Sequence, residues 1–256
     1  MRYCRFIHDD EPQYGRIEGD DIVEGIVFEG SHTTPFISPV KLRDAQLLAP
    51  ATPSKILCVG RNYREHASEL GNEVPAEPLI FFKPPSAIIG PGAAIKLPPA
   101  SLTQRVDYEG EFGVIIGERC RNLGEDENVR AYIRGYTCVN DVTARDLQKK
   151  DSQWTRAKGF DTFCPVGPVV VTPDELIFER GIEVTTRLNG KVKQEGNTRD
   201  FIFTLEHLIR YISQAMTLEP GDLISTGTPA GVGPMKSGDE VEVEVSGVGV
   251  LRNRVT

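Results

Sequence analysis

The chain has 256 residues, of which 39% are hydrophobic and 26% charged, so it can form one large domain and a small additional one. Its formal net charge of −8 argues against nucleic acid as a partner, because phosphate binding requires basic patches. No stretch approaches the roughly 20 consecutive apolar residues that a membrane helix needs, so no membrane partner is expected.

The five cysteines are odd in number and include no Cys-x-x-Cys pair. This usage is typical of reduced thiols, and we therefore expect a cytoplasmic protein. The first ten residues contain no uninterrupted apolar core, so they do not have the pattern of a secretory signal.

Residues 1–50 are predicted to form a small β domain of their own. Alternating apolar and polar residues at 14–18 and 22–28 are typical of strands, and Gly and Asp residues between them mark turns. Prolines then mark a connecting segment that leads into a main domain at residues 55–256. The first segment contains no cluster of catalytic residue types, so we expect it to pack against the main domain or a second subunit.

Most of the main domain is predicted to be β-structure. Short apolar segments between Gly and Pro turns favour a mainly β (α+β) fold, with a rolled or barrel-like core and short attached helices. The expected strands are 56–59, 79–82, 111–116, 136–139, 166–171, 182–188, 222–225 and 240–245. The clearest helix is 205–215, because its apolar residues recur on one stripe.

A short apolar strand that begins at Leu57 passes into a predicted helix of one or two turns, which ends at Gly71. His66 and Glu69 lie three positions apart on this helix, so the carboxylate can orient the imidazole and raise its basicity. Such a pair can activate water as a general base. The alternative is an ordinary surface histidine with a common neighbour. The polar segment 65–78 is predicted to be a mobile lid that orders when substrate binds.

Residues 106–117 are predicted to form one strand. Successive side chains of a strand point to opposite faces, which places Asp107, Glu109 and Glu111 on one face. Their carboxylates can converge on one point, and at least one would stay protonated unless a cation neutralised the group. Oxygen ligands of this kind suit Mg²⁺, Mn²⁺ or Ca²⁺ better than zinc. The alternative is a solvated strand face.

A further acid follows some thirty residues later. The apolar run 135–139 predicts a buried strand, and Asn140 or Asp141 would cap a helix that begins there. Asp141, Arg145 and Gln148 would then share one face of that helix. Asp141 would add a third carboxylate to the two glutamates, and Arg145 could clamp a substrate carboxylate through its planar fork. A capping aspartate with a surface ion pair is the alternative.

Six motifs follow one another between residues 60 and 233. They are Gly60-Arg61-Asn62-Tyr63-x-x-His66, Phe81-Phe82-Lys83-Pro84, Asp107-Tyr108-Glu109-x-Glu111, Asn140-Asp141-x-Thr143-Ala144-Arg145-Asp146-x-Gln148, Lys158-Gly159-Phe160-Asp161 with Pro165-x-Gly167-Pro168, and Ser225-Thr226-Gly227-Thr228-Pro229-x-Gly231-Val232-Gly233. In order and spacing, this series resembles the fumarylacetoacetate hydrolase family, from about residue 55 to the C-terminus. The series is very specific for the family, but not for one reaction within it.

The resemblance implies a mixed β-roll core and a homodimer, and it suggests roles for further residues. Lys158 would lie near the metal and stabilise developing negative charge, whereas a lone lysine is most often a solvated surface charge. Thr228 would contact substrate, and Gly227 beside it belongs to a glycine-rich loop that could hold a carboxylate. This loop lacks the Lys-Ser/Thr ending of a nucleotide-binding loop, so ATP is not expected. We assign Lys83 a structural role and Asp107 a supporting one.

We therefore predict an enzyme that cleaves C–C bonds of small 2-oxo acids through a metal-stabilised enolate, with Mg²⁺ or Mn²⁺ on the three carboxylates and Ca²⁺ as a further candidate. The leading reactions are acylpyruvate hydrolysis, with water activated by His66 and Glu69, and oxaloacetate decarboxylation. Arg145, Gln148 and the glycine-rich loop would bind the substrate. The alternative enzyme is an isomerase or decarboxylase of 2-hydroxyhepta-2,4-diene-1,7-dioate-type intermediates of aromatic catabolism. A non-catalytic, metal-stabilised binding module is a further alternative.

Overall fold

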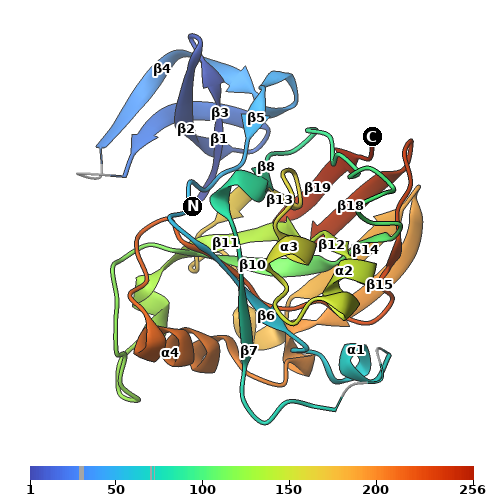
Figure 1. Ribbon diagram of the computed structural model, residues 1–256. Helices are drawn as coiled ribbons and strands as arrows, with labels where there is room; N and C mark the ends of the chain where they lie inside the picture. The colour runs from blue at the N-terminus through green and yellow to red at the C-terminus, as the bar shows by residue number, and fades with distance from the viewer. Residues whose placement is uncertain (29–31, 70, 72) are drawn as a thin grey trace.

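The computed structural model describes residues 1–28, 32–69, 71 and 73–256 (Figure 1). In this part of the chain the strands form sheets of twelve, three and four strands, and the helices are short. The expected mainly β (α+β) class is confirmed, although the largest sheet is open and does not close into a barrel. None of the helices in the described ranges is long and apolar enough to cross a bilayer.

The first strands of the chain form an antiparallel ladder that continues the largest sheet. They are β1 (Arg2–His8), β2 (Glu11–Glu18), β3 (Asp21–Val27), β4 (His32–Lys41) and β5 (Leu47–Leu48). β1 pairs with β2 and also with β13 (Cys164–Val171), so backbone hydrogen bonds join these strands to the rest of the sheet. The separation of residues 1–50 as a domain of their own stays a prediction.

The largest sheet has its most buried strands at the centre. Its order is β4-β3-β2-β1-β13-β11-β10-β16-β6-β7, with β5 on β1 and β8 on β13. The remaining strands are β6 (Ile56–Gly60), β7 (Leu79–Lys83), β8 (Ile88–Ile89), β10 (Gly110–Ile116), β11 (Ile133–Asn140) and β16 (Leu223–Ser225). Every residue of β10 is buried. Phe112 and Ile115 on β10 belong to different apolar clusters, because a strand presents its side chains to both faces.

Two smaller sheets and the short helices complete the fold. The sheets are β12-β9-β17 and β15-β14-β18-β19. Their strands are β9 (Val106–Tyr108), β12 (Thr143–Ala144), β17 (Gly233–Pro234), β14 (Glu183–Leu188), β15 (Lys191–Asn197), β18 (Glu240–Val245) and β19 (Gly249–Arg254). The α-helices are α1 (Arg64–Glu69), α2 (Arg145–Lys150), α3 (Thr155–Lys158) and α4 (Leu205–Ala215). The 3-10 helices are η1 (Leu42–Asp44), η2 (Pro85–Ala87), η3 (Val129–Tyr132), η4 (Phe178–Arg180) and η5 (Thr198–Asp200).

The eight strands expected in the main domain are all present, with ends that differ by up to three residues. The expected helix 205–215 is α4, and the side chain of Thr204 caps its start by accepting a hydrogen bond from the His207 amide. Its buried residues include Leu205, Leu208, Ile209 and Ile212. Figure 1 shows α4 and α1 at the end of the molecule that lies away from β1–β5.

The prediction of one continuous strand over 106–117 is wrong. The chain changes from the sheet of β9 to the sheet of β10 at Glu109. The Glu109 amide donates to Asn140 Oδ1 at 3.0 Å, and the Asp141 amide donates to the Glu109 carbonyl at 2.8 Å. These two bonds take the backbone of Glu109 out of the regular ladder of strand hydrogen bonds. Because the residues on both sides still alternate as in one strand, the sequence pattern does not reveal the interruption.

The prediction of a helix that begins at Asn140 or Asp141 is also wrong, because α2 begins at Arg145. β12 lies between them and pairs with β9, with Thr143 opposite Asp107. This pairing keeps the backbone extended until the Arg145 amide donates to the Arg105 carbonyl at 2.8 Å. Asp141 therefore reaches the site from the end of β11 and not from a helix face.

Candidate metal centre and active-site pocket

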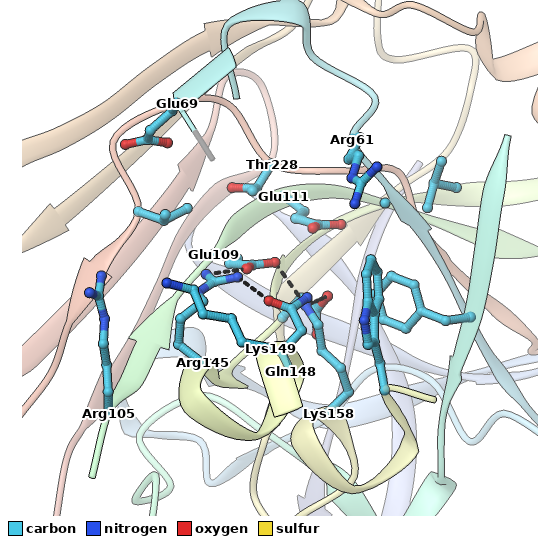
Figure 2. Close-up of a pocket in the computed structure, with 16 residues that line it drawn as sticks. Arg61, Glu69, Arg105, Glu109, Glu111, Arg145, Gln148, Lys149, Lys158 and Thr228 are labelled. Carbon is cyan, nitrogen blue, oxygen red and sulfur yellow. Dashed lines mark hydrogen bonds and ion pairs between the residues drawn. The ribbon is translucent and has the colours of Figure 1, made fainter. Parts of the chain in front are cut away.

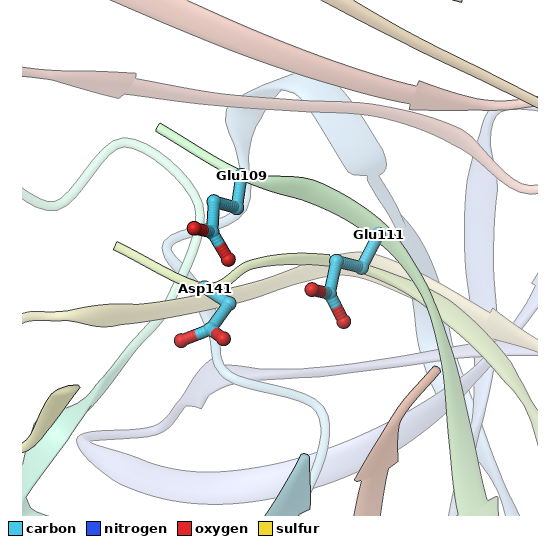
Figure 3. Close-up of side chains that lie close together, drawn as sticks. All are labelled: Glu109, Glu111 and Asp141. Carbon is cyan, nitrogen blue, oxygen red and sulfur yellow. The ribbon is translucent and has the colours of Figure 1, made fainter. Parts of the chain in front are cut away.

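Three acidic side chains lie close together and point toward one another (Figure 3). Glu109 lies at the junction of β9 and β10, Glu111 lies on β10, and Asp141 directly follows β11. One oxygen from each lies within 4.8 Å of the others, and the residues are 4%, 1% and 0% exposed, respectively. The predicted convergence of these three acids is thus present in the structure, and the alternative of a solvated strand face does not hold.

Two of the acids are held by buried cations. Lys158 Nζ donates to Glu109 Oε2 at 2.9 Å and to Asp141 Oδ2 at 2.5 Å. Lys83 Nζ donates to Asp141 Oδ1 at 2.6 Å, and Arg145 Nη2 donates to Glu109 Oε1 at 2.5 Å. Figure 2 shows Glu109 between Arg145 and Lys158. These pairs compensate the cost of burying the two carboxylates.

Glu111 has a different environment. Its Oε2 accepts hydrogen bonds from the Ser225 hydroxyl at 2.5 Å and from the Gly227 amide at 2.8 Å, which are both neutral donors. Within the described ranges, no residue donates a hydrogen bond to its Oε1. Burial, together with the charges of Asp141 and Glu109, raises the pKa of Glu111 to about 8.

The pKa of Glu109 shifts in the opposite direction to that of Glu111. Although burial opposes its ionisation, Lys158 and Arg145 hold the pKa of Glu109 well below its usual range. Glu109 and Asp141 are thus both bonded to buried cations, whereas the third acid, Glu111, lacks a cationic donor. Buried oxygen ligands in this state fit a hard divalent ion such as Mg²⁺ or Mn²⁺, since the ion would supply the missing positive charge.

His66 and Glu69 form the predicted pair on α1. His66 is 5% exposed, which excludes the alternative of a surface histidine, and its Nδ1 lies 3.4 Å from Glu69 Oε2. Both carboxylate oxygens of Glu69 accept from the Gly231 amide at 3.1 Å, so this side chain links α1 to the glycine-rich loop. Burial lowers the pKa of His66 below 6.5, although Glu109 and Glu69 oppose the shift. The imidazole is therefore neutral at pH 7 and can accept a proton.

The helix of His66 was expected to end at Gly71. It ends at Glu69, and Gly71 follows in the left-handed region, with φ at +69° and its amide donating to Ser68. The predicted lid at 65–78 includes residues 70 and 72, which lie outside the described residues. Its mobility stays a prediction.

Arg145 lies in the pocket, but its guanidinium already has three partners. Nε donates to Asp107 Oδ2 at 2.9 Å, Nη1 donates to Gln148 Oε1 at 2.6 Å, and Nη2 binds Glu109 as described. Asp107 also accepts hydrogen bonds from Nε and Nη2 of Arg105, at 2.9 and 3.1 Å. In this arrangement Arg145 holds Glu109 in place, and Asp107 holds Arg145. The expected role of Arg145 and Gln148 as a substrate clamp stays a prediction.

The glycine-rich loop also supports the acids. Thr228 Oγ1 donates to the Gly110 carbonyl at 2.8 Å and accepts from Gln194 Nε2 at 2.8 Å. Gly227 has φ at +103°, and a Cβ there would lie 2.7 Å from the Cβ of Asn62. Only glycine therefore fits the turn that directs the Gly227 amide to Glu111. Contacts of Thr228 and Gly227 with substrate stay predictions.

A pocket of about 480 Å³ lies over the acidic centre. Most of the predicted site residues line it, namely Glu69, Glu109, Glu111, Asp141, Arg145, Gln148, Lys158 and Thr228. His66 and Gly227 do not line the pocket themselves. Each is bonded to a residue that does, His66 to Glu69 and Gly227 to Glu111. Lys83, to which we assigned a structural role from the sequence, does not line the pocket and is bonded to Asp141, a candidate metal ligand.

Sequence reasoning did not assign a role to several other residues of the pocket. They are Val59, Gly60, Arg61, Phe81, Arg105, Lys149, Trp154 and Val232. The rings of Phe81 and Trp154 pack edge to face with centroids 5.1 Å apart, and Lys158 Nζ lies 4.8 Å from the Phe81 ring centroid. The only available signal was that Gly60, Arg61, Phe81 and Val232 belong to motifs of the resemblance.

The fold and the site define a mainly β protein with a buried triad of carboxylates beneath a polar pocket. Residues 55–256 match the family model described as fumarylacetoacetate (FAA) hydrolase C-terminal, and residues 1–50 match one described as Rv2993c-like, N-terminal. The chain belongs to the fumarylacetoacetate hydrolase family of enzymes.

Similar proteins carry several activities in their names. The chain is 44% identical over 222 residues to the mitochondrial oxaloacetate tautomerase FAHD2A of Bos taurus, a match that covers 83% of this chain and 70% of that protein. It is 41% identical to 2-hydroxyhepta-2,4-diene-1,7-dioate isomerase from Mycobacterium marinum, with a TM-score of 0.88 and coverage of 100% and 98%. It is 42% identical to 5-carboxymethyl-2-hydroxymuconate delta-isomerase from Mycobacterium smegmatis, with the same TM-score and coverage.

Proposed function

We propose that this enzyme forms and protonates the enol of small 2-oxo acids, and that tautomerisation of oxaloacetate is its first candidate reaction. The observation that carries the proposal is the buried triad of Glu109, Glu111 and Asp141 at the foot of the pocket. The name of the bovine relative supports the choice of reaction. Mg²⁺ or Mn²⁺ is the proposed cofactor.

Each group of the site has a part in this proposal. A divalent ion on the three carboxylates would act as a Lewis acid and stabilise negative charge on the C2 oxygen of the substrate. Lys158, which is bonded to Glu109 and Asp141, keeps those ligands ionised and adds positive charge beside the reacting oxygen. Removing a proton from C3 requires a base, and neutral His66, oriented by Glu69, is the proposed one.

Tautomerisation removes one proton from the substrate and returns one to it, so a single histidine can carry out both transfers. The imidazole accepts the C3 proton of the keto form, and the resulting imidazolium can return one proton to the C2 oxygen to give the enol. Because Glu69 lines the pocket and His66 does not, this role requires α1 to move toward the substrate. That requirement agrees with the predicted lid at 65–78.

A second candidate is C–C bond cleavage, as acylpyruvate hydrolysis or oxaloacetate decarboxylation. The contact of His66 with Glu69 favours it, because such a pair also suits the activation of water. Isomerisation of 2-hydroxyhepta-2,4-diene-1,7-dioate-type compounds uses the same proton transfers, and the name of the Mycobacterium marinum protein supports it. The homodimer and the cytoplasmic location stay predictions.

The proposal is tested by following three conversions in parallel with Mg²⁺, Mn²⁺ or EDTA. They are enol-to-keto conversion of oxaloacetate, pyruvate release from oxaloacetate, and pyruvate release from acetylpyruvate. We expect metal-dependent tautomerisation that Glu111→Gln abolishes, since this change removes a ligand that binds no cation and so leaves the ion pairs of the site intact. Equal rates in EDTA, or full activity of the variant, would contradict the proposal.

A further inference from the structure

We propose that Arg61 binds the second carboxylate of a 2-oxo dicarboxylate and thereby selects four-carbon dicarboxylates over monocarboxylic acids of the same length. This inference rests on the proposed function, because it assumes that the 2-oxo acid end of the substrate lies on the acidic centre. Arg61, and not Arg145, is then the residue that determines specificity for the far end of the substrate.

The positive charge that the pocket offers to a substrate depends on which of its cations are already paired. Within the described ranges, five cationic side chains line it, namely Arg61, Arg105, Arg145, Lys149 and Lys158. Three of them are already engaged in ion pairs, since Arg105 and Arg145 bind Asp107 and Lys158 binds two acids of the triad. A cation that is paired inside the protein gains little by binding a further anion. The charge available to a substrate therefore comes from the remaining two.

Arg61 and Lys149 differ in how they can use that charge. Neither forms an ion pair or side-chain hydrogen bond with a residue that the structure describes. Lys149 is exposed at the mouth, where solvent weakens its interactions, whereas Arg61 is partly buried. A guanidinium also presents a planar fork that matches a carboxylate, which a lysine ammonium does not. Of the two free cations, Arg61 is thus the better carboxylate ligand.

The backbone holds Arg61 in place for this role. Arg61 directly follows β6, whose last residue Gly60 pairs with Leu79 of β7. The next residue, Asn62, is fully buried, and its side chain donates to the Thr226 carbonyl at 2.9 Å and accepts from the Phe203 amide at 2.9 Å. Arg61 is therefore fixed on both sides, so that only its side chain is free to adjust to a ligand.

The conformation of Arg61 is an independent sign of function. Its φ is +58°, in the left-handed region, where a residue with a Cβ is strained and glycine or asparagine is more stable. Non-glycine residues in such conformations concentrate at functional sites. In Figure 2 Arg61 extends into the pocket from the side opposite Arg105 and Arg145, toward the space above Glu111. A chain that starts at the triad would thus extend toward Arg61 within the same pocket.

The test compares two 2-hydroxy acids that bind metals without reacting. L-malate and 2-hydroxybutyrate have the same four-carbon chain and differ only in a C4 carboxylate instead of a methyl group. Their affinities are measured by calorimetry with Mg²⁺ for the unchanged protein and for Arg61→Asn, a substitution that suits the left-handed backbone and removes the charge. Arg64→Gln, three residues along and outside this pocket, is the matched control for loss of one positive charge.

We expect the unchanged protein to bind L-malate more tightly than 2-hydroxybutyrate. In Arg61→Asn, affinity for L-malate should fall roughly ten- to hundredfold, as expected for a charged hydrogen-bonded contact, while affinity for 2-hydroxybutyrate stays the same. Arg64→Gln should change neither affinity. Retained binding of 2-hydroxybutyrate shows in the same experiment that the variant is folded and holds its metal.

Other outcomes would overturn the inference in ways that can be told apart. Equal binding of both acids by the unchanged protein, or equal losses for both in Arg61→Asn, overturns the role of Arg61 and leaves the proposed function standing. If Lys149→Gln lost as much affinity for L-malate as Arg61→Asn, general electrostatic attraction would be enough to explain the binding of the C4 carboxylate. That result would also overturn the specific role of Arg61. Binding of neither acid in Mg²⁺ or Mn²⁺ overturns the proposed function together with the inference.

Discussion

The hydroxyl of Ser225 donates a 2.5 Å hydrogen bond to Glu111, and this neutral contact distinguishes Glu111 from its two acidic neighbours. Glu109 and Asp141 are each bonded to lysine or arginine side chains. Glu111 is thus the one acid of the triad without a cationic donor among the described residues. A divalent ion bound between the three acids would supply the positive charge that Glu111 lacks.

Metal binding is predicted to release a proton from Glu111. Its pKa of about 8 means that the carboxyl group is mostly protonated at pH 7, whereas a metal ligand must be ionised. Calorimetric titration with Mg²⁺ in buffers of different ionisation enthalpy should show up to one proton released at pH 7 and close to none well above pH 8. The release should be absent in Glu111→Gln, and a proton count that does not change with pH would contradict the assignment.

The same shift predicts how the stability of the metal-free protein depends on pH. The pKa of Glu111 is raised above its ordinary value of 4.5, so the folded state holds a proton that the unfolded state loses in this range. Between about pH 4.5 and pH 8, the contribution of this group to the free energy of unfolding should therefore fall as the pH rises. Urea denaturation of the metal-free protein and of Glu111→Gln checks this, because the variant should lack that part of the slope.

Replacement of Lys158 by Met should destabilise the metal-free protein by about 3–5 kcal/mol, because two buried carboxylates lose their shared cation. Mg²⁺ should restore part of the loss, since the ion replaces the missing charge. The control is Arg156→Gln, which breaks an exposed pair with Asp151 and should cost at most about 1 kcal/mol. Equal losses in the two variants by urea denaturation would contradict the account of the buried pairs.

Activity is predicted to decline only at a pH below the usual titration range of a histidine. Burial lowers the pKa of His66, so the neutral imidazole that accepts a proton persists below the usual range of a histidine and is lost only at lower pH. The charge of Glu69 opposes this shift, and Glu69→Gln should move the acidic limb of kcat/KM to still lower pH. The pH profiles of the two proteins check the prediction, and a limb that stays in place would exclude His66 as the titrating base.

Substitution of Gly227 by Ala should weaken both folding and metal binding. The left-handed conformation alone costs about 1–2 kcal/mol, and the new Cβ would also collide with Asn62. Gly190→Ala is the matched control, because Gly190 has φ at +73° and no atoms within 4 Å of an added Cβ. Denaturation and Mg²⁺ titration should show a larger stability loss in Gly227→Ala and weaker metal binding in that variant alone.

Much of the fold was predictable because its strands are short apolar runs between turns, and each such run forms a strand. The junction at Glu109 was not, because the residues around it alternate as they would in one unbroken strand. The side chain of Asn140 and the amide of Asp141 create that junction, and they come from a distant segment. Pairing of Thr143 with Asp107 likewise delays α2, although the local sequence favours an earlier helix start.

The convergence of Glu109 and Glu111 could be predicted because only two positions of extended chain separate them, even though a junction interrupts the strand there. Asp141 was assigned to the triad from a helix start that the structure does not have, so its place was predicted but the reason for it was wrong. The partners of Arg145 could not be predicted, since its pairing with Asp107 and Glu109 depends on how three segments meet. Sequence alone therefore suggested Arg145 as a free clamp for substrate. The availability of Arg61 became visible only when the ion pairs of Arg105, Arg145 and Lys158 were known.

The central claim is that Glu109, Glu111 and Asp141 together bind one divalent ion. Crystals soaked in Mn²⁺ and measured at an anomalous wavelength test it most directly. The account predicts one strong peak coordinated by oxygens of all three side chains, which disappears in Glu111→Gln. A Mn²⁺ soak that gives no peak between these carboxylates, with Lys158 still bridging Glu109 and Asp141, would contradict it.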